Sequence, residues 1–181
     1  TAMVIHTIAV LLVEKLEEVF YQPERLLINE DLVPPEIAMA MELNVWLVEA
    51  MGILLSFLDP EACLDFFGEA ENAGMNPDSC SFVKSAVGMV IKNQQPKGIA
   101  MVSSNMPCDA GMASYTYIQK VYDVPVYRVD VPYHFYNQRA ENLVVKDLKR
   151  MIAFLEKHTP GRMDWNKLRE ICQKRNYMMT L

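Results

Sequence analysis

The sequence lacks the features of a nucleic-acid-binding or membrane-spanning protein. It contains 17 Lys and Arg against 23 Asp and Glu, a formal net charge of -6, so there is no basic excess to bind phosphates. Its most apolar stretch, residues 4–20, is interrupted by His6, Glu14 and Lys15. It also lacks a basic start and a small-residue cleavage site. We therefore expect no nucleic-acid partner, no membrane span and no secretion signal.

Cysteine and histidine are scarce, and no glycine-rich phosphate loop is present. The three histidines lie in separate segments and no Cys-x-x-Cys pair occurs, so the sequence does not indicate a four-ligand zinc site. Without a secretion signal, a disulfide framework is not expected, which favours a reduced, cytoplasmic setting. The four cysteines are Cys63, Cys80, Cys108 and Cys172.

What is present is typical of a globular α/β protein. With 51% hydrophobic and 22% charged residues, the chain can form one good-sized domain or part of a larger protein, and the start at Thr1 without an initiator Met suggests the latter. Short β-type runs predict strands within 25–31, 98–105 and 124–132. Helical spacing and capping residues predict helices over 4–21, 45–57, 59–74, 76–93, 137–158 and 164–177, and others after Val33 and Cys108.

Residues 98–132 read as strand, helix, strand. Such a βαβ unit implies two parallel strands joined by a right-handed crossover. The fold class that we predict is therefore a Rossmann-like parallel sheet with flanking helices and added helical segments. Three strands are few for a complete sheet of this kind, so we expect part of a longer, two-domain subunit.

Cys108 occupies the position where α/β proteins usually bind ligands. It lies beyond the carboxyl end of a predicted strand and just before a helix, where free N–H groups and the helix dipole favour an anionic sulfur. Cys80 has the same setting in the first turn of the preceding helix, with Asp78 or Ser79 as the cap. Two thiols so placed suit an iron–sulfur cluster.

Other interpretations of these cysteines stay open on the residues alone. A free cysteine is most often a small buried hydrophobe, and the spacing of Cys80 and Cys108 is no metal signature. Cys108 would need a base to act as a nucleophile, and only His134 follows a neighbouring strand.

Three segments together resemble the 2-hydroxyacyl-CoA dehydratase family, which includes 2-hydroxyglutaryl-CoA dehydratase D-component-like subunits and the benzoyl-CoA reductase subunits. They are "PDSCSFVKSAVG" (77–88), "GIAMVSSNMPCDAG" (98–111) and "VPVYRVDVPYHF" (124–135). The family shows a Cys-Ser-aromatic segment opening a helix, a strand ending in Cys-Asp and a strand ending in Asp-x-Pro. The segments 33–43 and 155–170 also look similar to the family's sequence.

The resemblance implies an oxygen-sensitive [4Fe–4S] cluster held by three cysteines in each of two related subunits. Two ligands match Cys80 and Cys108, and the family's third ligand lies later in the chain than this sequence extends. Cys63 and Cys172 match no family motif and are expected to be core or surface thiols. Whether this chain alone holds a cluster is left open.

The resemblance also implies a reaction and its partners. A separate ATP-dependent iron–sulfur activator supplies one electron, the acyl-CoA thioester becomes a ketyl radical anion, and the 2-hydroxyl group leaves. Loss of a β-proton then gives the 2-enoyl-CoA. The expected protein is thus a cytoplasmic lyase subunit of an anaerobic metabolism, with a related second subunit as heterodimer partner.

Further site residues follow from the same segments. Glu36, in a family-like Pro-x-Glu segment, is a candidate acid/base, although a glutamate at a helix start needs no function. Ser103, Ser104 and Asn105 precede Cys108 and are candidates for hydrogen bonds to cluster or thioester. Asp109 is expected to cap the following helix, or to support Cys108.

Two alternatives to the dehydratase come from the same superfamily: an ATP-dependent acyl-CoA reductase subunit, and a non-catalytic subunit that only relays electrons. A plain α/β binding module with buried cysteines is a third. The division that we predict is a helix-rich part over 1–97 with a short strand, a cluster-binding βαβ unit over 98–135, and a helical extension over 136–181.

Overall fold

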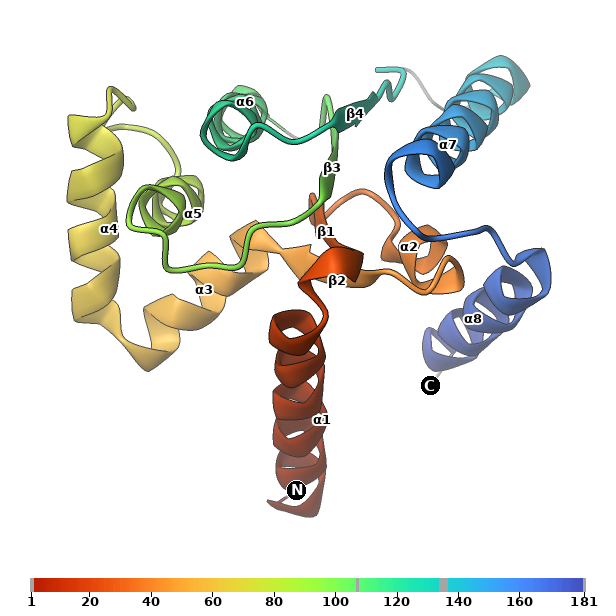
Figure 1. Cartoon of the computed structure of the whole chain (residues 1–181), viewed down its shortest axis with the longest axis horizontal. Coiled ribbons are helices and arrows are strands. Elements are labelled where there is room, and N and C mark those ends of the chain that lie inside the picture. The colour runs from red at the N-terminus through yellow and green to blue at the C-terminus, as the bar shows by residue number, and fades with distance from the viewer. Residues whose placement is uncertain (1, 107, 134–136, 181) are drawn as a thin grey trace.

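A computed structural model of the chain describes residues 2–106, 108–133 and 137–180. At its centre is a parallel sheet in the order β2-β1-β3-β4 (Figure 1). Ile28 of β1 aligns with Trp46 of β2 on one side and with Met101 of β3 on the other. The predicted α/β class is confirmed. The strands are β1 (Leu26–Asn29), β2 (Asn44–Leu47), β3 (Ala100–Ser104) and β4 (Val126–Val129).

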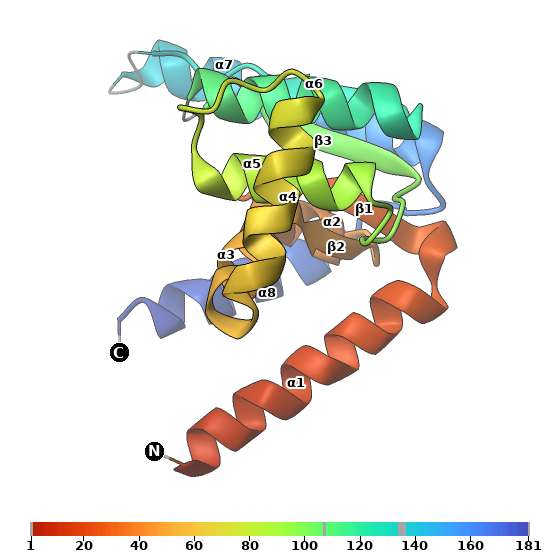
Figure 2. The ribbon, with the colours of Figure 1, turned by 90° about the vertical axis from the view of Figure 1, so that its left-hand side faces the viewer.

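Helices cover both faces of the sheet (Figure 1). Helices α3, α5 and α6 pack against one face, and helices α2 and α7 pack against the other. Figures 1 and 2 show α1 extending away from the rest of the chain. The helices are α1 (Ala2–Tyr21), the short 3-10 helix η1 (Pro23–Arg25), α2 (Pro35–Ala40), α3 (Val48–Leu58), α4 (Pro60–Asn72), α5 (Ser81–Ile91), α6 (Asp109–Tyr122), α7 (Gln138–His158) and α8 (Trp165–Met178).

Each strand sends alternate side chains into two separate cores, as the two-residue period of a strand requires. Ile28 and Met101 pack with Tyr115 and other residues of α5 and α6. Leu27 and Val102 point the other way, into the core shared with α2 and α7. Because both faces are covered, apolar residues follow one another along the strands, which is typical of a parallel sheet.

The prediction of a helix over 45–57 is wrong at its start. Asn44–Leu47 forms strand β2, which pairs with β1, and α3 begins only at Val48. A buried strand of a parallel sheet is a short continuous apolar run, and here it continues directly into an apolar helix, so periodicity alone cannot separate the two. The other three predicted strands are confirmed.

Helix α4 begins and ends as its sequence predicts. The side chain of Asp59 accepts a hydrogen bond from the backbone N–H of Ala62 at 3.0 Å, and Pro60 takes the first helical position. After the helix, Gly74 has φ +100°, a conformation that glycine adopts without a Cβ penalty. The N–H of Met75 then reaches the carbonyl of Ala70 at 3.0 Å, which closes the helix end.

Helices α4 and α5 cross in unusually close contact (Figure 2). A Cβ on Gly88 of α5 would overlap the backbone of Phe66 in α4, so only glycine fits there. One turn further along, Lys92 and Asp65 form an exposed ion pair between the same two helices. The crossing is therefore set by backbone-to-backbone packing.

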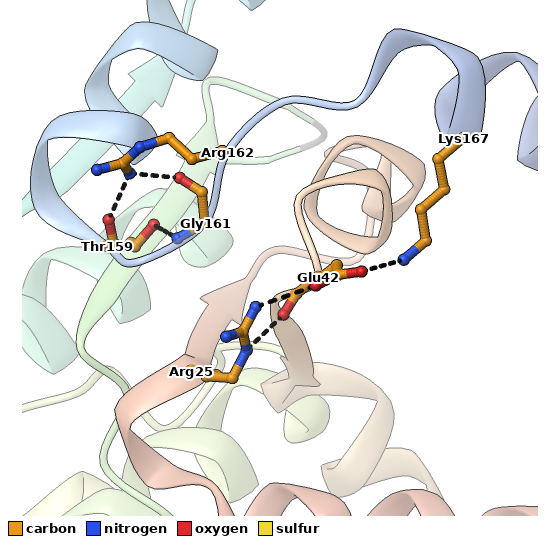
Figure 3. Close-up of polar contacts among 6 residues, drawn as sticks. All are labelled: Arg25, Glu42, Thr159, Gly161, Arg162 and Lys167. Atoms are coloured by element: carbon orange, nitrogen blue, oxygen red, sulfur yellow. Dashed lines mark hydrogen bonds and ion pairs between the residues drawn. The ribbon is translucent and has the colours of Figure 1, made fainter.

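The turn between α7 and α8 is held by its own polar groups, as the "TPGRMD" segment predicts. The Arg162 guanidinium donates to the carbonyls of Thr159 (3.2 Å) and Gly161 (2.7 Å) (Figure 3). Nearby, the carboxylate of Glu42 lies 3.1 Å from Lys167 Nζ of α8 and 3.7 Å from a guanidinium nitrogen of Arg25. These contacts link α8 to the amino edge of the sheet.

Strands from two predicted parts of the chain share one sheet, because β1 and β2 lie within 1–97 while β3 and β4 lie within 98–135. The division of the chain at residues 97 and 135 stays a prediction. Among the described residues, no helix has both the length and the apolar content needed to cross a membrane.

Candidate functional site at the carboxyl edge of the sheet

The strand order reverses between β1 and β3. From β1 the chain crosses over to β2 on one side, whereas β3 and β4 extend the sheet on the other. In open parallel sheets, ligands bind beyond the carboxyl ends of the strands at such a switch point. The polar residues at this edge are Glu30 and Asp31 after β1, Ser103, Ser104 and Asn105 at the end of β3, and Asp130 after β4.

Cys108 begins helix α6 as its N-cap and is exposed. Its Sγ accepts a hydrogen bond from the backbone N–H of Gly111 at 3.4 Å. The prediction that Asp109 caps this helix is wrong, because Asp109 is the first helical residue and the sulfur of Cys108 takes the capping position. The structure thus places the sulfur itself on the free N–H groups of the helix start.

Cys80 is likewise an exposed N-cap, of helix α5. The predicted position in the first turn, with Asp78 or Ser79 as cap, is wrong by a short shift. Asn76 uses its side-chain and backbone oxygens to accept the N–H groups of Asp78 and Ser79, both at 2.9 Å. This turn delays the helix, so that it begins at Ser81.

The two cysteines lie at the same edge of the sheet. Helix α5 leads into the amino end of β3 and α6 follows its carboxyl end, so both helices run against the strands and start at the carboxyl edge. The two helices pack side by side. Within the described ranges, no group of three Cys, His, Asp or Glu side chains is close enough to hold a metal. Both thiols, Cys80 and Cys108, are free and exposed.

Ser104 connects the ends of β1 and β3. Both its backbone N–H and its hydroxyl bond the buried carboxylate of Glu30, the hydroxyl at 2.9 Å. The pKa of Glu30 is raised mainly by burial, and the two bonds from Ser104 partly oppose that rise. This pair fixes the two central strand ends relative to each other.

Two further carboxyl groups approach Glu30. Burial raises the pKa of Asp31, while the N–H of Ala50 bonds its carboxylate and partly opposes the rise. Burial also raises the pKa of Glu49, in the first turn of α3, and with the charges of Asp31 and Glu30 brings it to about 7. A carboxyl group with such a pKa can both hold and release a proton near neutral pH.

Tyr115 of α6 adds a buried hydroxyl to the acidic group that Glu30, Asp31 and Glu49 form. The tyrosine is 1% exposed, and its oxygen has no hydrogen-bond partner among the described residues. Its pKa is raised by burial and then by the charges of Glu49, Asp31 and Glu30. Ser103, also buried, has a hydroxyl that finds no partner in the described part of the chain.

Glu49 and Cys108 flank the same small space. A methyl group added to Gly111 would lie 3.5 Å from Glu49 Oε1 and 3.7 Å from Cys108 Sγ. At Gly111 there is thus room for a methyl group that would contact both the Glu49 carboxyl and the Cys108 sulfur.

The remaining predicted residues lie differently. The side-chain amide of Asn105 donates to Asp130 Oδ1 at 2.9 Å and its oxygen accepts the N–H of Val131 at 2.9 Å, so it ties the ends of β3 and β4 together. Glu36 lies in α2, which packs on the opposite face of the sheet from α5 and α6, and it pairs with Arg175 of α8 at 3.0 Å. The structure does not bring Glu36 together with the cysteines.

Comparison with protein families decides the identity of the chain. The model of the 2-hydroxyglutaryl-CoA dehydratase D-component matches residues 32–181. The chain belongs to this dehydratase family. The resemblance that the sequence motifs indicate is thereby confirmed, and with it a 2-hydroxyacyl-CoA dehydratase-type subunit. A search of curated proteins found no match.

Four residues of this candidate site were not predicted from the sequence: Glu30, Asp31, Glu49 and Tyr115. A signal existed for the first two, because "ED" directly follows strand β1, which is mostly apolar. Glu49 was hidden because residues 45–57 read as one helix, and Tyr115 because a tyrosine in a helix is usually core. His134, the histidine weighed as a base for Cys108, lies outside the described residues.

Proposed function

We propose that the chain is a subunit of an oxygen-sensitive [4Fe–4S] (R)-2-hydroxyacyl-CoA dehydratase, which eliminates water to give a 2-enoyl-CoA. The observation that carries the proposal is the pair of exposed cysteines, Cys80 and Cys108, at the starts of neighbouring helices on the carboxyl edge of the sheet. Free backbone N–H groups at both positions favour the negative charge of thiolates and of a cluster.

Cys80 and Cys108 would hold the cluster, with a third cysteine from a later part of the family's chain. When bound, a [4Fe–4S] cluster supplies one-electron transfer to the substrate. In the proposed reaction an ATP-dependent activator provides that electron. The thioester becomes a ketyl radical anion, the 2-hydroxyl group leaves, a β-proton is lost and the electron is recovered.

Glu49 is the group of this chain best suited to move the proton. Its pKa of about 7 lets the carboxylate accept a proton and return it, and Oε1 lies beside the space at Cys108. Glu30 and Asp31 favour the protonated form by their charge. The unpartnered hydroxyls of Ser103 and Tyr115 are donors for a polar group of the substrate or for a water molecule.

The partners that this proposal requires are a related second subunit, forming a heterodimer, and the activator protein. Both fit the family match, which covers a single component of a dehydratase. The setting that we propose is the cytoplasm of an organism with an anaerobic metabolism, because the cluster is oxygen-sensitive and the cysteines are free.

The experiment is to measure iron and acid-labile sulfide in the anaerobically purified full-length complex. About four of each per cluster are expected, with clear loss in Cys108→Ala and in Cys80→Ala. Cys172→Ala, in α8 and away from the site, is the matched control and is expected to keep its iron. Absence of iron, or equal iron in all three variants, would contradict the proposal.

The same complex separates the alternatives. Formation of 2-enoyl-CoA from a 2-hydroxyacyl-CoA supports the dehydratase. Reduction of an aromatic acyl-CoA without dehydration would instead assign the reductase of the same superfamily. A cluster that is reduced but unaffected by either substrate would assign electron relay.

A further inference from the structure

Lys84 is a buried lysine one helical turn after Cys80. Its side chain is 9% exposed, and its Nζ donates to Glu71 Oε1 of α4 at 2.7 Å and to the backbone carbonyl of Pro77 at 2.7 Å. The ammonium also lies 5.3 Å from the ring centre of Phe67 in α4. One cation thus joins α5, α4 and the loop between them, and that loop leads directly into Cys80.

Burial of this ammonium is costly and calls for a reason. Lysine is almost never fully buried unless it is paired, and a buried ion pair contributes little net stability once desolvation is counted. The helix pair does not depend on this ion pair alone, since the backbone contact at Gly88 and the exposed Lys92–Asp65 pair already join α4 to α5. What Lys84 adds is the bond to Pro77, in the middle of the loop.

The loop over residues 73–80 has few other attachments. At its start, the N–H groups of Ala73, Gly74 and Met75 bond to carbonyls of α4. Further on, Asn76 accepts the N–H groups of Asp78 and Ser79, and these two bonds shape the turn without fastening it to the rest of the molecule. Among the described residues, the hydrogen bond from Lys84 Nζ to the Pro77 carbonyl fastens this turn to a buried group.

We infer that Lys84 is a positioning residue, which holds the loop over residues 73–80 against α4 and thereby fixes the Cys80 thiol at the start of α5. Its importance for a cluster rests on the proposed function of Cys80 as a ligand. The role of Lys84 in holding the loop does not rest on that function, so the hold on the loop and the effect on a cluster can be tested separately.

The test compares Lys84→Met with Lys92→Met in the full-length complex. Methionine keeps the apolar stem beside Phe67 but removes the charge and the bond to Pro77. Lys92→Met, the matched control, breaks an ion pair between the same helices without touching the loop. Hydrogen exchange of the backbone amides is followed in residues 73–84, and in 105–112 around Cys108.

With Lys84→Met, exchange in 73–84 is expected to rise at least about tenfold, equivalent to a loss of about 1.4 kcal/mol in local opening free energy. Exchange around Cys108 stays unchanged, and so does exchange at the buried Cys63 near the start of α4. Iron is expected to leave the variant faster than wild type under a chelator. The control Lys92→Met matches wild type in both measurements.

Three outcomes would overturn the inference: no change in loop exchange, equal changes at Cys63 and Cys108, or faster exchange with unchanged iron retention. Should Lys84→Met fail to fold, Glu71→Gln removes the carboxylate and keeps the lysine, and the same criteria apply. A wild-type complex without iron would contradict the proposed function, and exchange alone would then decide whether Lys84 holds the loop.

Discussion

The starts of α5 and α6 present the same residue in the same role with different support. Cys108 follows central strand β3 closely, its sulfur accepts the N–H of Gly111, and it has Glu49 as neighbour. Cys80 follows a loop fastened by Lys84, and its side chain accepts no capping bond from the described residues. One candidate ligand is therefore placed by the sheet, and the other by a pair of helices.

The largest effect is expected from Gly88→Ala, which changes the packing of α5, the helix that begins after Cys80, against α4. The added methyl group would overlap the backbone of Phe66, so α4 and α5 must separate. We expect a loss of about 3 kcal/mol in unfolding free energy, the upper end for overpacking a core. Denaturant unfolding measures it.

Gly68→Ala in α4 is the control for that change. No atom lies within 4 Å of the position of its added methyl group, so it is expected to be neutral or to stabilise by up to about 1 kcal/mol. If the two glycine variants were equally stable, the close crossing of α4 and α5 would not be what supports Cys80.

The next effect concerns the Cys108 side, through Glu49→Gln. The pKa of Glu49 is raised from its ordinary 4.5 to about 7, so between these pH values the folded state binds more protons than the unfolded state. Wild-type stability therefore falls as pH rises from 4.5 to 7. Glutamine lacks the charge. The variant is expected to be more stable than wild type at alkaline pH by about 1–2 kcal/mol, after allowance for solvent screening.

Urea unfolding at pH values below and above this window checks the expectation. The difference between variant and wild type shrinks on the acid side, where the wild-type carboxyl is already protonated in both states. Parallel stability profiles for the two proteins would show that the Glu49 carboxyl titrates normally.

The smallest effect on stability, and a clear one on activity, is expected from Gly111→Ala. The methyl group fits at ordinary contact distances from Glu49 Oε1 and Cys108 Sγ, and alanine favours helix by up to about 1 kcal/mol. The melting temperature should therefore hold or rise slightly, while the methyl group fills the space between the two groups and lowers the turnover of the complex. Wild-type turnover in the variant would show that this space is not part of the proposed site.

The sequence predicts the parts of this site that local chemistry decides. Cys108 at a strand end before a helix, the Asp59 cap and the Gly74 stop all follow from rules that act within a few residues. The family motifs add the proposed role of Cys80 as a cluster ligand. That both cysteines are themselves the N-caps of their helices depends on the geometry of the preceding turns, which the sequence does not resolve.

The acidic group could not be predicted in the same way. Glu30, Asp31 and Glu49 come together only because β1 and β2 are adjacent strands, and β2 reads as the beginning of a helix. Their raised pKa values come mainly from burial, which depends on packing between distant segments. The buried hydroxyl of Tyr115 is likewise a property of the assembled fold.

The crossing at Gly88 has a mechanical consequence. Lys84 and Lys92 each lie four residues from it along α5, one on either side, about 6 Å away at the rise of an α-helix. Helix α5 is thus attached to α4 at three points, by the backbone contact at Gly88 and by one ion pair on each side of it. A tilt of α5 about the contact would have to stretch an ion pair, so a displacement of the amino end, where Cys80 lies, is resisted on both sides of Gly88.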